Sequence, residues 1–570
     1  MIFTINIFGG ENILQKNKSF KNSISTILII VTLLIMVSSL QTSFAANSIT
    51  TIDETQSIQT DGISETEDKG TLILNSGTYY QSKMVIDRNI TIQGNGPANT
   101  VTIDANKLGR IFTINNDVDV TFINITFLRG SHSSGGGAVY NNYQNSMITF
   151  INCSFINNNA QDFGSGGAIL NRGIMNVLGC NFTNNNDSWN GAGIANYGSA
   201  NVSDSIFIKN RAGACGAIHN NGFMNVSNSY FDGNTAGGGA GAIGNFGSMN
   251  VTGCYFVKNR ANVGGAIGNY GTINVSGSIF INNSAVQNSG SQGGAIYHNH
   301  ASLADIQYNS FVNNTASDGY VITIVGTGLV LADFNWWGAN NVDPSGLVNR
   351  ITINNRYMMF FNSTDTRSKV VGENFIVNYY FKLNVTDASE EYERLPNFNT
   401  TIKYNDYTIE IINAKESQTI IIPLTVAGAA IITATTDNEI QSLSLDVRDG
   451  QNNNDNDDDN DGDNPDGNAD GYPDGNADGN ADGYPGDNAD GYPDGNSDGN
   501  ADGYPGDNAG DNADDYPDDN AIDNVDIENA TKKTNADNIN AFAAMKKTGM
   551  PIIALILLVM TMFVVVRRKS

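Results

Sequence analysis

Hydrophobic and polar positions recur along the middle of the chain with a period of 24 to 25 residues. Between Gly166 and Asn283 one unit is written five times: small residues, an aliphatic residue, Asn two positions later, Gly-x-x-Asn-Val, and a closing Cys/Ser-x-Phe-x-x-Asn. The aliphatic positions are Ile169, Ile194, Ile218, Ile243 and Ile267. This period, with no helical spacing inside it, is typical of a solenoid. We expect three short strands per repeat, paired in parallel with the next repeat.

Several positions of the repeat are expected to form interior columns. The closing phenylalanines extend beyond the five repeats, as Phe127, Phe155, Phe182, Phe207, Phe231, Phe256, Phe280 and Phe311. A ladder of side-chain amides is predicted for Asn171, Asn196, Asn220, Asn245 and Asn269. Turns with positive φ are predicted for Gly173, Gly198, Gly222, Gly247 and Gly271.

A column of small residues lies two positions before each closing Phe. Cys153, Cys180 and Cys254 occupy it on three rungs, and serine occupies it on others. Because Cys153 and Cys180 fall on neighbouring rungs, the pattern is compatible with stacked free thiols or with one disulfide between them.

The segments around the repeats follow other patterns. From Thr71 to Phe127, short alternating runs punctuated by glycine indicate irregular first coils of the same solenoid, as expected of a terminal cap. Residues 349–448 alternate with period two, clearest from Val377 to Val385, which predicts a small immunoglobulin-like β-sandwich. The fold class is therefore all-β.

The two ends of the chain carry export and anchoring signals. Lysines precede an apolar run and Ser43-Phe44-Ala45, which indicates a secretory signal peptide at 1–45, with an uncleaved anchor as the alternative. Residues 550–566 are continuously apolar and 567–570 are basic, which predicts one membrane span with a cytoplasmic tail. We expect a cell-surface ectodomain.

The net charge of −28 is a local property. The stretch from Asp449 to Ala530 contains 26 carboxylates and no Lys or Arg, so the acidity gives no evidence of a nucleic-acid partner. Its DGNADGYPDGN composition predicts a solvated spacer, with weak calcium loops as the alternative. The candidate calcium ligands are Asp457, Asp459, Asp461, Asp466, Asn468 and Asp470. No other cofactor is expected. Frequent Asn-x-Ser/Thr sequons make an exported chain a candidate glycoprotein.

Two motifs that alternate in phase, GGA-Ile/Val and Phe-x-x-Asn, resemble the repeats of chlamydial polymorphic outer membrane proteins. The layout of residues 70–340 is similar to adhesin-like surface proteins of methanogenic archaea, including Asn335-Trp336-Trp337-Gly338 at the end of the repeats. The resemblance implies a right-handed parallel β-helix of the pectate-lyase-like superfamily. Two indoles at the last coil would cover an open apolar end.

Catalytic chemistry of that superfamily needs carboxylates that converge on one face. No Glu occurs between Glu67 and Glu373, and no phase of the repeat has Asp on consecutive rungs, so no catalytic residue is predicted. Outward aromatics after the ladder Asn, Tyr197, Phe246 and Tyr270, are candidates for stacking on sugar rings, although they could be ordinary turn residues.

Basic residues recur at the same positions of alternate repeats, which is typical of a solubilising surface, with an anion-binding site as the alternative. It consists of Lys209, Arg211, Lys258 and Arg260.

The sequence predicts a non-catalytic, membrane-anchored adhesin-like protein that contacts glycans or surface proteins of other cells. The alternatives are a polysaccharide lyase or glycosidase and a purely structural component of the cell envelope. The predicted parts are a signal peptide at 1–45, a polar segment at 46–70, a β-helix at 71–348, a sandwich at 349–448, a spacer at 449–545, a membrane helix at 550–566 and a tail at 567–570.

Overall fold

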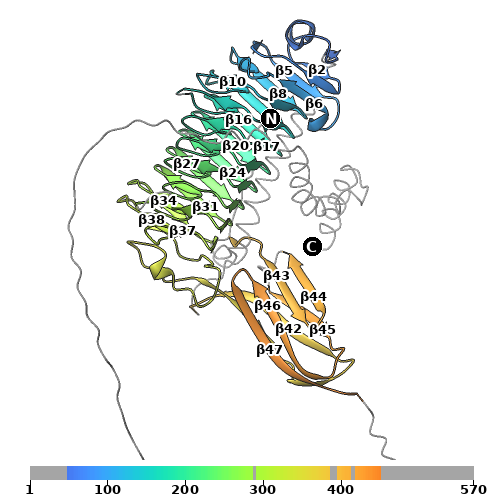
Figure 1. Ribbon diagram of the computed structural model, residues 1–570, viewed down its shortest axis with the longest axis vertical. Helices are drawn as coiled ribbons and strands as arrows, with labels where there is room; N and C mark the ends of the chain where they lie inside the picture. Colours follow the sequence, from blue (N-terminus) through green and yellow to red (C-terminus); the bar gives the residue numbers. More distant parts are fainter. Residues whose placement is uncertain (1–47, 163, 287–289, 386–393, 413–416, 451–570) are drawn as a thin grey trace, which may run out of the picture. The chain divides into compact units, whose positions relative to one another are not determined.

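The computed structural model describes residues 48–162, 164–286, 290–385, 394–412 and 417–450. These residues form a parallel β-solenoid of the right-handed type, with about 11 turns, followed by two smaller sheets. Figure 1 shows the strands of successive coils side by side. Helix is confined, within these ranges, to one turn of π-helix, η1 (Ile58–Ile63), and two 3-10 turns, η2 (Ala98–Thr100) and η3 (Pro344–Gly346).

Three long parallel sheets and one short-stranded sheet make the solenoid. Sheet A contains β1 (Ile49–Ile52), β2 (Gly70–Leu74), β5 (Ile90–Gly94), β8 (Asp119–Ile123), β12 (Met147–Ile151), β16 (Ile174–Leu178), β20 (Ser199–Ser203), β24 (Phe223–Ser227), β28 (Ser248–Thr252), β31 (Thr272–Ser276), β35 (Ala304–Ile306) and β39 (Val330–Leu331). Sheet B contains β3 (Gly77–Tyr79), β6 (Val101–Asp104), β9 (Thr126–Leu128), β13 (Ser154–Ile156), β17 (Asn181–Thr183), β21 (Ile206–Ile208), β25 (Tyr230–Asp232), β29 (Tyr255–Val257), β32 (Ile279–Ile281) and β36 (Ser310–Val312).

Sheet C contains β4 (Met84–Ile86), β7 (Phe112–Ile114), β11 (Val139–Asn141), β15 (Ile169–Asn171), β19 (Ile194–Asn196), β23 (Ile218–Asn220), β27 (Ile243–Asn245), β30 (Ile267–Asn269), β34 (Ile296–His298) and β38 (Ile322–Ile324). Sheet D has strands of two residues: β10 (Ser131–His132), β14 (Asn159–Ala160), β18 (Asn186–Asp187), β22 (Arg211–Ala212), β26 (Thr235–Ala236), and separately β33 (Ser284–Ala285) and β37 (Thr315–Ala316). The central rungs therefore have the three expected strands, and most of them have a fourth, shorter one.

Stacking in register places equivalent side chains above one another, which confirms the predicted interior columns. The rings of neighbouring closing phenylalanines lie 4.6–4.9 Å apart from Phe127 to Phe311. The column continues into Trp337, whose ring is 5.1 Å from Phe311. Trp336 instead packs edge-on against Phe381 in the second core. Both indoles are buried, but only Trp337 closes the column of the solenoid.

The predicted amide ladder is present. Each side-chain nitrogen donates to the next side-chain oxygen over 2.7–3.0 Å from Asn141 to Asn269, and Asn269 reaches His298 at 2.8 Å. The motif-closing asparagines form a second buried ladder at 2.9–3.1 Å. Its members are Asn158, Asn185, Asn210, Asn234, Asn259, Asn283 and Asn314.

The prediction of positive φ at the repeat glycine is wrong. Gly173, Gly198, Gly222, Gly247 and Gly271 are absent from the positive-φ glycines of the described chain. Glycine is required there because of close packing between rungs: a Cβ on Gly247 would lie 2.0 Å from the carbonyl oxygen of Gly222.

The small-residue column is buried as expected, and its cysteines are free thiols. Cys153 and Cys180 lie on adjacent rungs, and the Cys153 amide donates to Cys180 Sγ at 3.3 Å. The disulfide alternative is therefore wrong.

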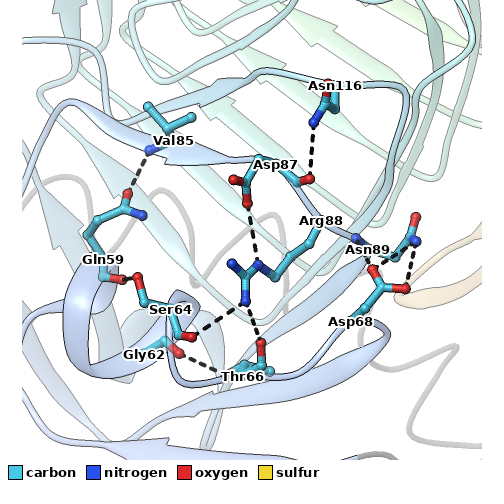
Figure 2. A network of polar contacts seen from close by, with 10 residues as sticks. All are labelled: Gln59, Gly62, Ser64, Thr66, Asp68, Val85, Asp87, Arg88, Asn89 and Asn116. Atoms are coloured by element: carbon cyan, nitrogen blue, oxygen red, sulfur yellow. Dashed lines mark hydrogen bonds and ion pairs between the residues drawn. The ribbon is translucent and has the colours of Figure 1, made fainter.

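The N-terminal end of the solenoid is covered by η1 and by side-chain hydrogen bonds around it. Ile58 and Ile63 of η1 are buried, and β1 pairs with β2, so sheet A begins inside the segment 46–70. Figure 2 shows the polar contacts of this cap: Gln59 Oε1 accepts from the Val85 amide at 2.7 Å, and an Arg88 guanidinium nitrogen donates to the Thr66 carbonyl at 3.0 Å. The Gln59 side chain thus satisfies a backbone N–H group of β4, the terminal strand of sheet C.

Two further sheets follow the solenoid and share a hydrophobic core. One contains β40 (Tyr357–Asn362), β42 (Asn374–Leu383) and β45 (Gln418–Pro423), in that order. The other has the order β41 (Ser368–Val370), β47 (Glu439–Arg448), β46 (Gly428–Thr436), β43 (Asn399–Tyr404) and β44 (Tyr407–Ile412). Only β41 and β47 pair in parallel in these two sheets.

Several sequence predictions lie outside the described residues. They are the signal peptide at 1–45, nearly all of the spacer at 449–545, the membrane helix at 550–566 and the tail at 567–570. Within the described ranges, no helix has the length and apolar character needed to cross a membrane.

Candidate functional site

The candidate site lies on the outer face of sheet C. Its strands end at the ladder Asn, whose side chain points inward, so the residues immediately before and after that Asn point outward. The three predicted residues, Tyr197, Phe246 and Tyr270, follow the ladder Asn on their rungs. Phe246 is 41% exposed, and Tyr197 and Tyr270 are partly buried.

On these rungs a ring occupies only one of the two positions that flank the ladder Asn. Where the following residue is aromatic, the preceding residue is small: Ala195 before Tyr197, Gly244 before Phe246 and Gly268 before Tyr270. Where the preceding residue is a ring, the following residue is Asn: His219 with Asn221, and Tyr297 with Asn299. A Cβ on Gly244 would lie 3.6 Å from the Phe246 ring, so the ring covers the glycine.

Rings from both positions therefore form one continuous row, which we call the aromatic row: Tyr197, His219, Phe246, Tyr270 and Tyr297. Successive centroids are 5.6, 5.1, 4.8 and 5.8 Å apart. The Phe246 and Tyr270 rings are nearly parallel, at 9°. The Arg172 guanidinium, 5.4 Å from the Tyr197 ring, extends the row by one rung. The structure thus places the three predicted residues in one row and adds two buried rings, His219 and Tyr297, which are 6% and 8% exposed.

The row is uncharged at neutral pH. Burial lowers the pKa of His219 to about 4. The pKa of Tyr270 is raised to about 12, chiefly by burial and further by Tyr297 and Cys215. Burial also raises the pKa of Tyr297. Flat neutral rings with polar edges are the surface that stacks on the apolar faces of sugars.

A buried polar cluster supports the row from below. Cys215 Sγ lies 3.7 Å from His219 Nδ1 and 3.9 Å from Asn190 Oδ1. A Cβ on Gly244 would lie 2.2 Å from this sulfur, so the thiol occupies the space that the glycine leaves. Asp187 Oδ1 accepts from the amide of Trp189 at 2.6 Å, while its Oδ2 is buried without a hydrogen-bond partner in the described residues.

The pKa of Cys215 is shifted in the opposite direction to that of a reactive cysteine. Burial raises the pKa of Cys215 to about 12, and the Asp187 carboxylate adds to the effect. Burial also raises the pKa of Asp187 to about 8, against the backbone hydrogen bonds that lower it. A cysteine nucleophile needs a lowered pKa and a cationic neighbour. Cys215 is therefore a neutral thiol that positions His219.

No group of three metal-ligating side chains suited to an ion occurs in the part of the chain that the structure describes. The predicted calcium ligands, Asp457 to Asp470, lie outside that part.

No protein-family model matches the sequence, and no curated protein is significantly similar to it.

Proposed function

We propose that this chain is a membrane-anchored, adhesin-like protein of the cell surface whose solenoid binds glycans without catalysis. The observation that carries the proposal is the aromatic row, five rings in contact on five consecutive rungs, with Phe246 and Tyr270 stacked at its centre. A sugar chain that runs along the solenoid axis would stack chiefly on the rings of Tyr197, Phe246 and Tyr270, because His219 and Tyr297 are only 6% and 8% exposed.

The sequence supports display outside the cell. The patterns at 1–45 and 550–566 are those of an export signal and a single membrane anchor. The strand order of β40–β47, with three strands in one sheet and five in the other, supports an immunoglobulin-like module between the solenoid and the spacer. The spacer and this module would hold the solenoid away from the membrane.

A glycan array with the full-length protein tests the proposal. Each aromatic contact contributes about 0.5–1.5 kcal/mol, so the Phe246→Ala/Tyr270→Ala variant should bind roughly 5- to 100-fold more weakly. Tyr255→Ala is the matched control, because Tyr255 is a similarly exposed ring, 38%, on the outer face of sheet B. Equal losses in both variants would contradict a site at the row.

Two other functions remain outcomes of the same work. Turnover of uronic-acid polysaccharides by the wild-type protein would replace the proposal with a lyase or glycosidase of the pectate-lyase-like superfamily. Binding to no glycan and to no partner cell would favour a purely structural component of the cell envelope.

A further inference from the structure

A recess lies on sheet D, separate from the aromatic row on sheet C. It has a volume of about 450 Å³ and is lined by Arg211, Thr235, Ala236, Gly237 and Arg260. Arg211 pairs in register with Thr235, and Thr235 with Arg260, so one column of three rungs forms its wall. We call it the arginine groove. Its volume is within the range of small-ligand sites.

The side chains of the two arginines of the groove have no partner within the residues that the structure describes. No ion pair and no side-chain hydrogen bond of Arg211 or Arg260 occurs there, and both residues are exposed. Lys209 and Lys258 precede them by two residues on the same rungs, but these lysines face Asp232, whose pKa they lower against the larger effect of burial. The lysine charges are therefore partly compensated, and the arginine charges are not.

This excess of positive charge is local. Residues 166–283 contain five basic residues and three acidic ones, a formal balance of +2, in a chain whose net charge is −28. Four of the five basic residues are the two lysines and two arginines of this column and its neighbour. An unpaired cationic recess on an acidic protein would attract anionic ligands selectively.

Gly237 keeps the groove open. It is exposed, its φ is not positive, and a Cβ there would meet nothing closer than the Gly213 carbonyl oxygen at 3.3 Å. A Cβ at this position needs only a small shift of the Gly213 carbonyl, unlike at Gly241, where a Cβ would lie 2.0 Å from a carbonyl oxygen. Asn262 Nδ2 donates to the Gly237 carbonyl at 2.7 Å and holds the loop in place. A larger side chain at 237 would occupy the recess.

We infer that the arginine groove binds an acidic glycan through carboxylate or sulfate groups on alternate sugars. The guanidinium fork matches the geometry of both oxyanions, and the Thr235 hydroxyl lies between the two arginines for a sugar oxygen. The arginines are two rungs apart, about 9.6 Å between backbones. That separation is comparable with the length of a disaccharide. The inference concerns a different sheet from the aromatic row and does not depend on it.

Binding of the full-length protein to immobilised hyaluronan, chondroitin sulfate, polygalacturonate and neutral dextran tests the inference. Hyaluronan carries a carboxylate on alternate sugars, chondroitin sulfate adds a sulfate ester, and polygalacturonate is charged on every sugar. For Arg211→Gln/Arg260→Gln we expect roughly tenfold or more weaker binding to hyaluronan or chondroitin sulfate, with a reduced salt dependence. Because both polymers carry the carboxylate, stronger binding to chondroitin sulfate than to hyaluronan would show that the sulfate contributes.

Two variants provide the controls. Lys209→Gln/Lys258→Gln removes the same charge from the same rungs and should keep most of the affinity, whereas Gly237→Leu keeps the charge and should lose it by filling the groove. An equal loss in the lysine variant, unchanged binding by Gly237→Leu, or a preference for polygalacturonate would overturn the inference. Far-UV circular dichroism checks that each variant is folded.

The experiment tests the aromatic-row proposal and the arginine-groove inference independently. Phe246→Ala/Tyr270→Ala should weaken binding to neutral glycans and leave the arginine effect on hyaluronan unchanged. If the row variant has no effect while the arginine variant does, the aromatic proposal fails and the groove stands.

Discussion

Asn196 and Asn201 lie on the same rung, each in an asparagine ladder, yet their replacement by alanine should have very different effects. The Asn196 side chain is fully buried. It donates to Asn220 Oδ1 at 2.9 Å and to the Gly198 and Phe223 carbonyls at 3.1 Å, and it accepts from Asn171 Nδ2 at 2.9 Å.

The Asn201 side chain is exposed to water. It donates to Asn176 Oδ1 at 3.1 Å and accepts from Asn225 Nδ2 at 2.9 Å. When either ladder bond of Asn201 is lost, water replaces it. The pair thus separates the effect of burial from that of the ladder itself.

The magnitudes follow from the number of buried hydrogen bonds. Asn196→Ala loses one accepted hydrogen bond and three donated contacts, two of which share a hydrogen because the amide carries only two. At about 0.5–1.5 kcal/mol per bond, and with some partners keeping a second hydrogen bond, we expect a destabilisation of about 2–4 kcal/mol. For Asn201→Ala we expect no more than about 0.5 kcal/mol. Urea unfolding followed by far-UV circular dichroism measures both values.

Two further choices sharpen the experiment. Asn201 begins a sequon, so the proteins should be made in a host that does not N-glycosylate them. Hydrogen exchange should increase at β15, β19 and β23 and stay unchanged at β4, because a rung contacts only its neighbours. Equal destabilisation by the two substitutions would refute the reasoning, since the ladders would then contribute independently of burial.

Three other predictions follow from the packing of the rungs. Gly247→Ala should prevent stable folding, because its Cβ would lie 2.0 Å from a backbone oxygen. Gly237→Ala, whose Cβ would lie 3.3 Å from the Gly213 carbonyl oxygen, should lower the unfolding temperature only slightly, and thermal unfolding distinguishes the two variants. As the pH rises from about 4 to 8, unfolded Asp187 ionises while the folded carboxyl, with its pKa raised from 3.8 to about 8, stays protonated. The wild type should therefore lose stability over that range, by at most about 1.4 kcal/mol per pH unit, and Asp187→Asn should not; urea titrations at pH 4, 6 and 8 would show a constant difference if this is wrong. Burial raises the pKa of Cys215 and of Cys254 to about 12, so a thiol reagent should label neither in the native protein and both in urea; rapid native labelling would contradict the structure.

The solenoid could be predicted because its core is periodic. Ile194, Val202 and Phe207 recur at the same phase on successive rungs, and identical residues at one phase must stack when the rungs do. The glycine column shows that a repeating sequence position does not reveal the physical reason for its conservation between repeats. The repeat of Gly222 and Gly247 establishes that a side chain is excluded, but the cause, contact with the rung below, depends on coordinates.

The candidate site could be predicted only in part, because its residues do not repeat. Tyr197, Phe246 and Tyr270 share one phase and were accessible from the sequence. His219 and Tyr297 lie two positions earlier on their rungs, so a search along one phase misses them. Reading the two outward positions together, large against small, would have found the whole row.

Because successive rungs make the same contacts with each other, whole repeats can be gained or lost without new core contacts. Asn196 meets Asn220 in the same way that Asn220 meets Asn245, and the closing phenylalanine rings stack at nearly constant spacing. Removal or duplication of one whole repeat in the gene would join two rungs that already fit, with no new core contact required. Unequal recombination could thus lengthen or shorten the solenoid in single-rung steps, whereas an insertion or deletion inside a strand would shift the residues that follow it out of their columns.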